Sequence, residues 1–356
     1  MRKGIWWWML WIAGSVASFA QPYFGQAGYI YGYSWPHHDH LTRNAGQQTD
    51  GFFVQVLRPP RFDRQGRWVY PESGFHAAYI DLKNEHTRYL VTLAYVLNFP
   101  LYKARHHRFY FTWGEGLARN GGYYDEEKNP ANLVFGSRYL FYSFLGFNWR
   151  KLFDGGGALE TGILMYHSSN ALVNVPNNGL NIPSFQISWF PVYDKRHERQ
   201  EVDARADTLR WHGRLFAYGA WNRPDLRRTP LGFFWNAGAE VSRLLNFHWR
   251  WVAGAEWMES QSLREWIRYR HIAFGLPLVP SSRAGVFTGP ELVWTGMSLG
   301  WRTGWYVYNP SGAYAKWYWR MAVRFHIYKP LYAGLQLKGH FFVAEEMSFG
   351  LTYQLW

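Results

Sequence analysis

The chain has 356 residues, of which 18% are charged and 21% aromatic, including 22 Trp and 25 Tyr. So many amphipathic rings are hard to place in a soluble core but are typical of membrane–water interfaces. Hydrophobic residues make up 48% and the mean hydropathy is −0.34, which excludes both a bundle of membrane helices and a disordered chain. The absence of cysteine excludes disulfides, thiol nucleophiles and Cys-ligated zinc.

The amino terminus has the features of a signal peptide. Arg2 and Lys3 precede an apolar run at 5–13, and small residues at 18–20 offer a cleavage site. The run is too short to span a bilayer as a helix. We therefore expect residues 1–20 to be a cleaved signal peptide and the remainder to be exported. The full chain has a net charge of +13 and stays strongly basic once Arg2 and Lys3 are removed. For an exported basic chain, phosphorylated lipid is a better anionic partner than nucleic acid, although the simpler interpretation is that the charges are scattered and solvated.

Long runs along the chain alternate with period two. At 247–257, 316–327 and 331–343, apolar side chains occupy one parity and charged or polar side chains the other. Runs of ten or more such residues are typical of transmembrane strands, whereas strands of soluble sandwiches average about 5–6 residues. Further strands are expected at 26–34, 51–58, 75–83, 89–98, 108–118, 135–149, 158–169, 181–193, 212–222, 231–243, 291–305 and 348–356.

The sequence thus predicts an all-β fold, an antiparallel transmembrane β-barrel of about 12–14 strands formed by residues 21–356. Single-chain bacterial barrels have an even strand number, and the candidates above are odd in number. The segment 258–290 is the hardest to interpret, because residues 263, 266, 267 and 270 have helical spacing, which fits a short interfacial helix or no regular element. The charged run 195–210 belongs in a loop outside the membrane.

Residues 159–181 carry the clearest chemical signal. Ile163, Met165, His167 and Ser169 share one parity, and residues two apart on a strand lie about 6.6 Å apart on the same face. A serine hydroxyl needs such a neighbour, because it is a poor nucleophile until a base takes its proton. Asn181 shares parity with apolar residues of the next strand. Polar groups on a lipid-facing wall make sense if the substrate is a lipid.

The segments 167–171 (HSSNA) and 176–181 (PNNGLN) resemble the active-site motif of the lipid A 3-O-deacylase (PagL) family, H-x-S-N followed by P-N-x-G and an acidic residue. A looser resemblance runs over 51–181 and includes 114–117 and 132–137. The resemblance implies an outer-membrane β-barrel that removes an acyl chain from lipid A at a site on its outer wall.

Carried over by position, the resemblance implies that Ser169 is the nucleophile and His167 its general base. It places Asn170 and Asn177 near the oxyanion and gives Gly179 the role of shaping the loop. Asn181 stands where the family has the acidic residue that orients the histidine. An amide oxygen can accept the imidazole N–H but cannot offset the imidazolium charge. Glu160 has the opposite parity, and Glu115 on another strand remains a second candidate for that role.

These observations predict a serine esterase in the outer membrane of a Gram-negative bacterium that removes a fatty acyl chain from lipid A. The expected partner is lipid A in the outer leaflet, and the mechanism requires no cofactor and no metal. The alternative is a non-catalytic outer-membrane barrel, either a pore or a degenerate deacylase with a structural or lipid-binding role. The segment 37–40 (HHDH) has metal-binding residue types, but adjacent residues of an extended chain point to opposite sides, which favours a solvated loop.

Overall fold

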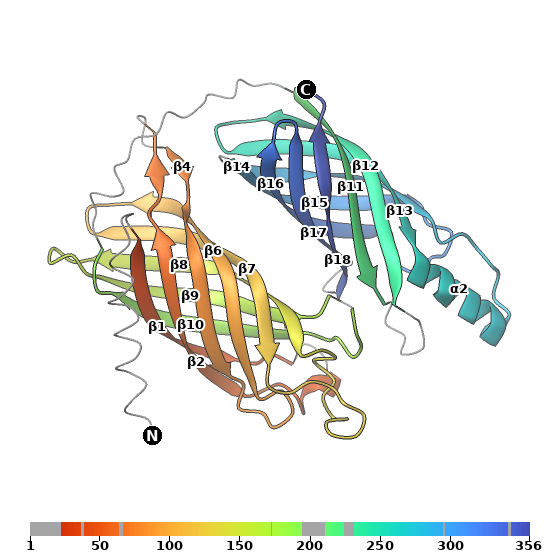
Figure 1. Ribbon diagram of the computed structural model, residues 1–356, viewed down its shortest axis with the longest axis horizontal. Coiled ribbons are helices and arrows are strands. Elements are labelled where there is room, and N and C mark those ends of the chain that lie inside the picture. The colour runs from red at the N-terminus through yellow and green to blue at the C-terminus, as the bar shows by residue number, and fades with distance from the viewer. Residues whose placement is uncertain are drawn as a thin grey trace. The chain divides into compact units, whose positions relative to one another are not determined.

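The computed structural model describes residues 23–36, 39–63, 67–171, 173–193, 211–223, 231–294, 296–340 and 343–356. Within them the chain forms two closed antiparallel barrels of eight strands each (Figure 1). The predicted signal peptide at 1–20, the pair His37 and His38, and the charged run 195–210 lie outside the described residues. The two barrels are described separately below.

Barrel 1 is built from the first half of the chain. Each of its strands pairs with the next, and the sheet closes where the first strand pairs with the last. Its strands are β1 (Phe24–Tyr33), β2 (Gln48–Arg58), β5 (Glu72–Asp81), β6 (Tyr89–Lys103), β7 (His107–Asn120), β8 (Tyr139–Leu152), β9 (Ala158–Ser169) and β10 (Leu180–Phe190). The 3-10 helix η2 (Asp39–Leu41) and the short pair β3 (Arg61–Phe62) and β4 (Trp68–Tyr70) lie in its loops.

Barrel 2 is built from the second half and closes through its own first and last strands. Its strands are β11 (Trp211–Asn222), β12 (Gly232–Leu244), β13 (Trp249–Ser260), β14 (Arg283–Trp294), β15 (Met297–Tyr308), β16 (Trp317–Tyr328), β17 (Leu331–His340) and β18 (Val343–Gln354). The α-helix α2 (Gln261–Phe274) joins β13 to β14. In the described residues no helix combines the length and the apolar character needed to cross a membrane.

Alternation along each strand sorts side chains between the barrel interior and the outer wall. The interior of barrel 1 holds an apolar cluster and a buried ion-pair group. Arg150 binds Glu72 at 2.8 Å and Glu160 at 2.6 Å, with all three side chains out of contact with solvent. Burying charges this deeply is costly unless they are paired, and here one guanidinium serves two carboxylates.

The interior of barrel 2 is more strongly charged. Arg214 and Arg324 each bind both Glu240 and Glu291, with nitrogen–oxygen distances of 2.7–3.2 Å. Arg302 lies within 3.8 Å of the same two carboxylates. Eight-stranded barrels have interiors just wide enough for side chains to fill, and these paired charges occupy that space.

The antiparallel all-β barrel is confirmed, but the expectation of one barrel of about 12–14 strands is wrong, because the strands close as two barrels of eight. Alternation is a local property that does not specify which edges pair. The segment 258–290 contains α2 and most of β14, a strand that the sequence did not reveal. The expected strand 291–305 crosses the turn between β14 and β15.

Loop lengths differ between the two ends of each barrel. In barrel 2 the connections 245–248 and 329–330 at one end are short, whereas at the opposite end the α2 connection 261–282 and the loop 309–316 are longer. In barrel 1 one end has 104–106 and 153–157, together with 59–71. The other end has 34–47, 82–88, 121–138 and 170–179. The candidate site lies at this second end of barrel 1.

Candidate active site

The core of the candidate site is a pair of side chains on neighbouring strands. In the β9–β10 register His167 lies directly opposite Asn181, and His167 Nδ1 is 2.7 Å from Asn181 Oδ1. Both lie on the outer side of the barrel, because the residues of the other parity, such as Tyr166 and Ser168, are buried in the interior. The predicted parity of this segment therefore agrees with the structure.

Ser169 follows His167 by two positions at the end of β9. Its side chain is only 8% exposed although its parity is that of the outer wall. Gly179 packs against the pair, because a Cβ built on it would lie 3.1 Å from His167 Cε1 and 3.3 Å from Ser169 Cβ. Gly179 has φ +69°, a left-handed conformation that glycine adopts without steric cost. Gly179 at the end of this connection thus lies against both His167 and Ser169.

Two asparagines hold this connection together. Asn177 Oδ1 accepts a hydrogen bond from the backbone N–H of Asn170 at 2.7 Å. Asn170 Nδ2 donates to Ser137 Oγ at 3.0 Å. The Asn177 oxygen is therefore engaged within the loop, and the chemistry left to its side chain is that of an N–H donor.

A second segment supports the loop from the β7–β8 connection. Asn178 Nδ2 donates to the carbonyl of Leu133 at 2.7 Å, and the Gly179 N–H donates to the carbonyl of Val134 at 3.3 Å. On the far side of β10, the Trp35 N–H donates to the Asn181 carbonyl at 2.8 Å. Sequence reasoning assigned no role to Ser137 or Trp35. Ser137 lies in the stretch 132–137 that resembles the family. This resemblance was the only signal in the sequence that pointed to Ser137.

The two glutamates considered for the third position lie elsewhere. Glu160 points into barrel 1 and pairs with Arg150, as its parity predicted. Glu115 faces the outer side, and the register aligns it with Ser143, which in turn lies opposite His167. Two strand spacings of about 4.8 Å separate the Glu115 and His167 backbones. Asn181, in contrast, contacts the imidazole directly.

The contact with Asn181 specifies the state of the histidine. A carbonyl oxygen can only accept, so the 2.7 Å contact requires a proton on Nδ1, and in the neutral imidazole the lone pair is then on Nε2. A neutral imidazole held in this tautomer is suited to accept a proton from a hydroxyl. The arrangement can therefore support nucleophilic acyl transfer by a serine.

The outer wall beside the site is apolar. Ile163, two residues before Met165 on the same face of β9, is 71% exposed. Phe185 and Ile187 of β10 are also exposed. Leu145 and Phe147 continue this surface on β8. A contiguous exposed apolar surface beside buried polar groups is what a site for a lipid substrate requires.

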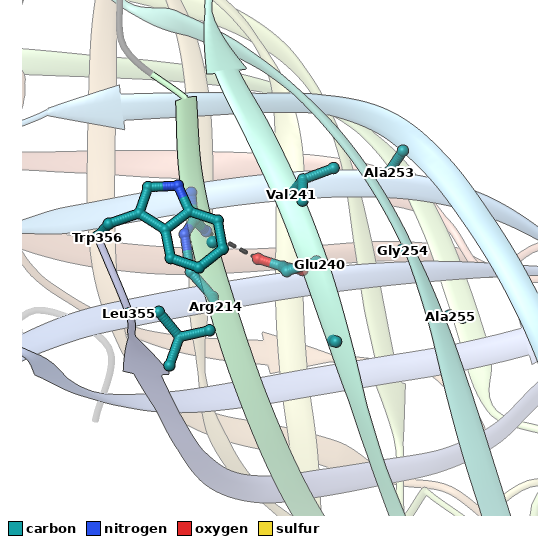
Figure 2. Close-up of a pocket in the computed structure, with 10 residues that line it drawn as sticks. Arg214, Glu240, Val241, Ala253, Gly254, Ala255, Leu355 and Trp356 are labelled. Atoms are coloured by element: carbon teal, nitrogen blue, oxygen red, sulfur yellow. Dashed lines mark hydrogen bonds and ion pairs between the residues drawn. The ribbon is translucent and has the colours of Figure 1, made fainter.

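A separate hollow lies on barrel 2 and includes none of the predicted site residues. It is a shallow, open hollow of about 360 Å³ over β11, β12 and β13, where Ala239, Ala253 and Ala255 leave space on the outer wall. Figure 2 shows Leu355 and Trp356 on one side of it and the ion pair of Arg214 and Glu240 beneath. In the described part of the chain, no three His, Asp or Glu side chains are grouped to hold a metal ion.

Comparison with known families gives two matches that together cover most of the chain. The model of the family described as lipid A 3-O-deacylase (PagL) matches residues 3–190, just over half of the chain. The model described as the acyloxyacyl hydrolase C-terminal domain matches residues 212–356. The boundary between the two matches coincides with the boundary between barrel 1 and barrel 2.

The sequence matches no curated protein. Among solved structures, a mutant ferric enterobactin receptor from Pseudomonas aeruginosa in complex with enterobactin is 10% identical with a TM-score of 0.22, and the alignment covers 89% of this chain and 44% of that chain. A mutant porin from Rhodopseudomonas blastica is 7% identical with a TM-score of 0.19, covering 94% of this chain and 99% of the porin. This chain thus spans less than half the length of the receptor.

Proposed function

Because the chain belongs to the lipid A 3-O-deacylase (PagL) family, we propose that it is an outer-membrane serine esterase that removes a fatty acyl chain from lipid A. The observation that carries the proposal is the contact of His167 with Asn181 beside Ser169, on an outer wall of exposed apolar side chains. Such a wall presents the catalytic groups to a substrate whose acyl chains lie in the membrane.

In the proposed mechanism Nε2 of His167 takes the proton of the Ser169 hydroxyl as Oγ attacks the ester carbonyl carbon. The tetrahedral intermediate collapses by breaking the bond to the lipid A oxygen, which leaves with the proton held by the imidazolium. Water then attacks the acyl-serine ester and gives its proton to Nε2. The fatty acid leaves as the Ser169 hydroxyl is restored by that proton.

Asn170 and Asn177 are proposed to lie near the oxyanion of this intermediate. The engaged Asn177 oxygen fixes the orientation of its amide group, so the NH₂ is the end available to donate. Preorganised donors of this kind typically contribute about 10²–10³ in kcat. The second amide is held by its other end, because Asn170 Nδ2 donates one N–H to Ser137 Oγ, and the second N–H of this NH₂ group is the one proposed to donate to the oxyanion.

Asn181 is proposed to orient the His167 ring but not to offset the positive charge of its protonated form. Its amide oxygen keeps the imidazole in the productive tautomer at 2.7 Å. It lacks the negative charge that stabilises an imidazolium, so we expect a slower acylation step than a carboxylate at this position would support.

Loop asymmetry supports a placement in the outer membrane with the site outward. Outer-membrane barrels have short periplasmic turns and longer extracellular loops. The site end of barrel 1 carries the longer set of connections, which supports an orientation with Ser169 toward the outer leaflet, where lipid A resides. Export to that membrane requires a signal such as the one proposed at residues 1–20.

A degenerate, non-catalytic family member is the second candidate, and the amide at position 181 is the observation that favours it. One measurement distinguishes the active esterase from the degenerate member. The purified full chain, mixed with diphosphorylated lipid A in detergent, should release one fatty acid that mass spectrometry detects as a discrete mass loss from lipid A. Intact lipid A after prolonged incubation, with the barrels still heat-modifiable on a gel, favours the degenerate member.

A further inference from the structure

Among the described residues, helix α2 is attached to barrel 2 through its first two turns, where Leu263 and Ile267 are buried. Ser260 Oγ caps the helix by accepting from the Leu263 N–H at 3.2 Å. Ser262 Oγ donates to Asn222 Oδ1 at 2.8 Å, and Gln261 Oε1 accepts from the Phe233 N–H at 3.2 Å. These contacts fix where the helix starts and in which direction it leaves the barrel.

The remainder of the helix lacks this support. Burial ends at Ile267, and the helix terminates at Gly275, which has φ +64° and donates its N–H to the carbonyl of His271. Figure 1 shows α2 extending beyond the end of β13. A free helix of this length is marginal in water, because most helical stability in proteins comes from packing of one face.

The unsupported part carries large apolar side chains. Ile272 is 74% exposed and Phe274 67%, while Tyr269 is also exposed and contacts Phe274 edge to face. Leu278, in the connection that follows the helix, is 62% exposed. Exposing several such side chains on one short element is costly in water. Something apolar must cover them for the helix to persist.

The same helix is basic. Arg264 and Arg268 are four residues apart and share a face, and Arg270 lies over the Trp266 ring at 4.5 Å. Glu265 is the only acidic residue of the helix. Basic side chains beside Trp, Ile and Phe are typical of helices that lie in a membrane interface and contact anionic head groups.

The position along the barrel axis at which α2 begins agrees with a location in the membrane interface. Exposed Trp221, Trp235, Trp257 and Trp305 lie toward the α2 end of barrel 2, as an aromatic belt at a membrane interface does. Trp235 lies opposite Glu259, two residues before the helix begins. At about 3.3 Å per residue the helix starts roughly 7 Å beyond the belt, which is the level of lipid head groups.

We propose that α2 docks on the membrane surface, with Arg264 and Arg268 binding the phosphate groups of phosphorylated lipid and the Ile272–Phe274 end covered by acyl chains. This inference rests on the outer-membrane placement in the proposed function but not on hydrolysis. It assigns α2 a lipid contact separate from Ser169. Each arginine near an anionic surface contributes about 1 kcal/mol, so removing two lowers the docking equilibrium about 30-fold.

The native chain has no cysteine, so a single Ala273→Cys substitution carries a nitroxide label at an exposed position of α2. The protein, with Ser169→Ala to keep the lipid intact, is reconstituted into phosphatidylcholine vesicles with or without diphosphorylated lipid A. Lipid A should raise the collisions of the nitroxide with oxygen and lower its access to a water-soluble nickel reagent several-fold. High salt should reverse this shift, because it screens the charges.

The variant Arg264→Gln/Arg268→Gln should lose the response to lipid A. The matched control Arg243→Gln/Lys316→Gln removes the same charge from exposed residues outside α2 and should retain it. A nitroxide that stays accessible to nickel with lipid A, or that is equally buried without it, overturns the proposal. So does an arginine variant that behaves like its control. The label position does not depend on fatty-acid release, so this failure is distinguishable from failure of the esterase assignment.

Discussion

His167 and Asn181 face each other across β9 and β10, and their side chains meet at 2.7 Å on the outer wall of barrel 1. The family motif has an acidic residue where Asn181 stands. The geometry of an orienting contact is therefore present without its charge. Two effects can therefore be measured separately at this position. One is the positioning of His167 by a hydrogen bond, and the other is the stabilisation of its protonated form by a negative charge.

Substitutions at position 181 test this separation. Asn181→Glu supplies a carboxylate to the imidazolium formed during attack, and we expect it to hold or raise the rate of fatty-acid release. Asn181→Leu keeps the approximate volume but has no acceptor, and the rate should fall at least about tenfold, as expected for the loss of one hydrogen bond worth about 1.4 kcal/mol. Initial rates on diphosphorylated lipid A measure both effects. Equal rates for all three proteins would show that Asn181 does not act on the histidine.

Gly179 provides a test of the close packing around the site. In Gly179→Ala the added Cβ lies 3.1 Å from His167 Cε1, and the left-handed backbone costs about 1–2 kcal/mol. The matched control is Gly312→Ala, where φ is +58° but nothing lies within 4 Å of the added Cβ. Both variants should lose similar stability, whereas only Gly179→Ala should lose activity, by about tenfold or more. An activity loss shared by both would assign the effect to strain alone.

The two ends of the Asn177 side chain have different proposed roles. Asn177→Asp keeps the oxygen that accepts from the Asn170 N–H but removes the NH₂ group. If the amide donates to the oxyanion, kcat should fall by about 10²–10³ while the melting temperature is unchanged. Asn177→Leu should lower both. A fully active Asn177→Asp would limit Asn177 to holding the loop.

The interior ion pairs of barrel 1 predict a large stability effect. Arg150→Met leaves Glu72 and Glu160 buried without their shared cation, and breaking such a group costs about 3–5 kcal/mol. The exposed Arg119→Met removes the same charge from the surface and should change the free energy of unfolding by less than about 0.5 kcal/mol. The temperature at which each variant loses its heat-modifiable gel mobility measures the difference. Equal temperatures would contradict the interior placement of Arg150.

Much of the site could be predicted from the sequence because its signals are local. The parity that places His167 and Ser169 on one face needs only the period of a strand, and the close motif match is confined to 167–181. The contact between Asn170 and Ser137 could not be predicted, because it joins residues 33 positions apart through a connection whose path depends on the folded barrel.

The number of barrels could not be predicted for a related reason. Sixteen strands can close as one sheet or two, and the choice depends on the pairing of β1 with β10 and of β11 with β18. The strand β14 escaped detection because Gly285, Gly289 and Pro290 interrupt its alternation. Helix α2 was suggested by the spacing of Leu263, Trp266 and Ile267, and the structure confirms a helix there.

The central claim is that Ser169 is the nucleophile, and two adjacent serines test it most directly. Ser169 lies on the outer side at the end of β9, whereas Ser168 is buried on the interior side. Mass spectrometry of lipid A from cells expressing each variant should show full deacylation with Ser168→Ala and none with Ser169→Ala, at equal amounts of heat-modifiable protein. Deacylation that persists in Ser169→Ala would contradict the account.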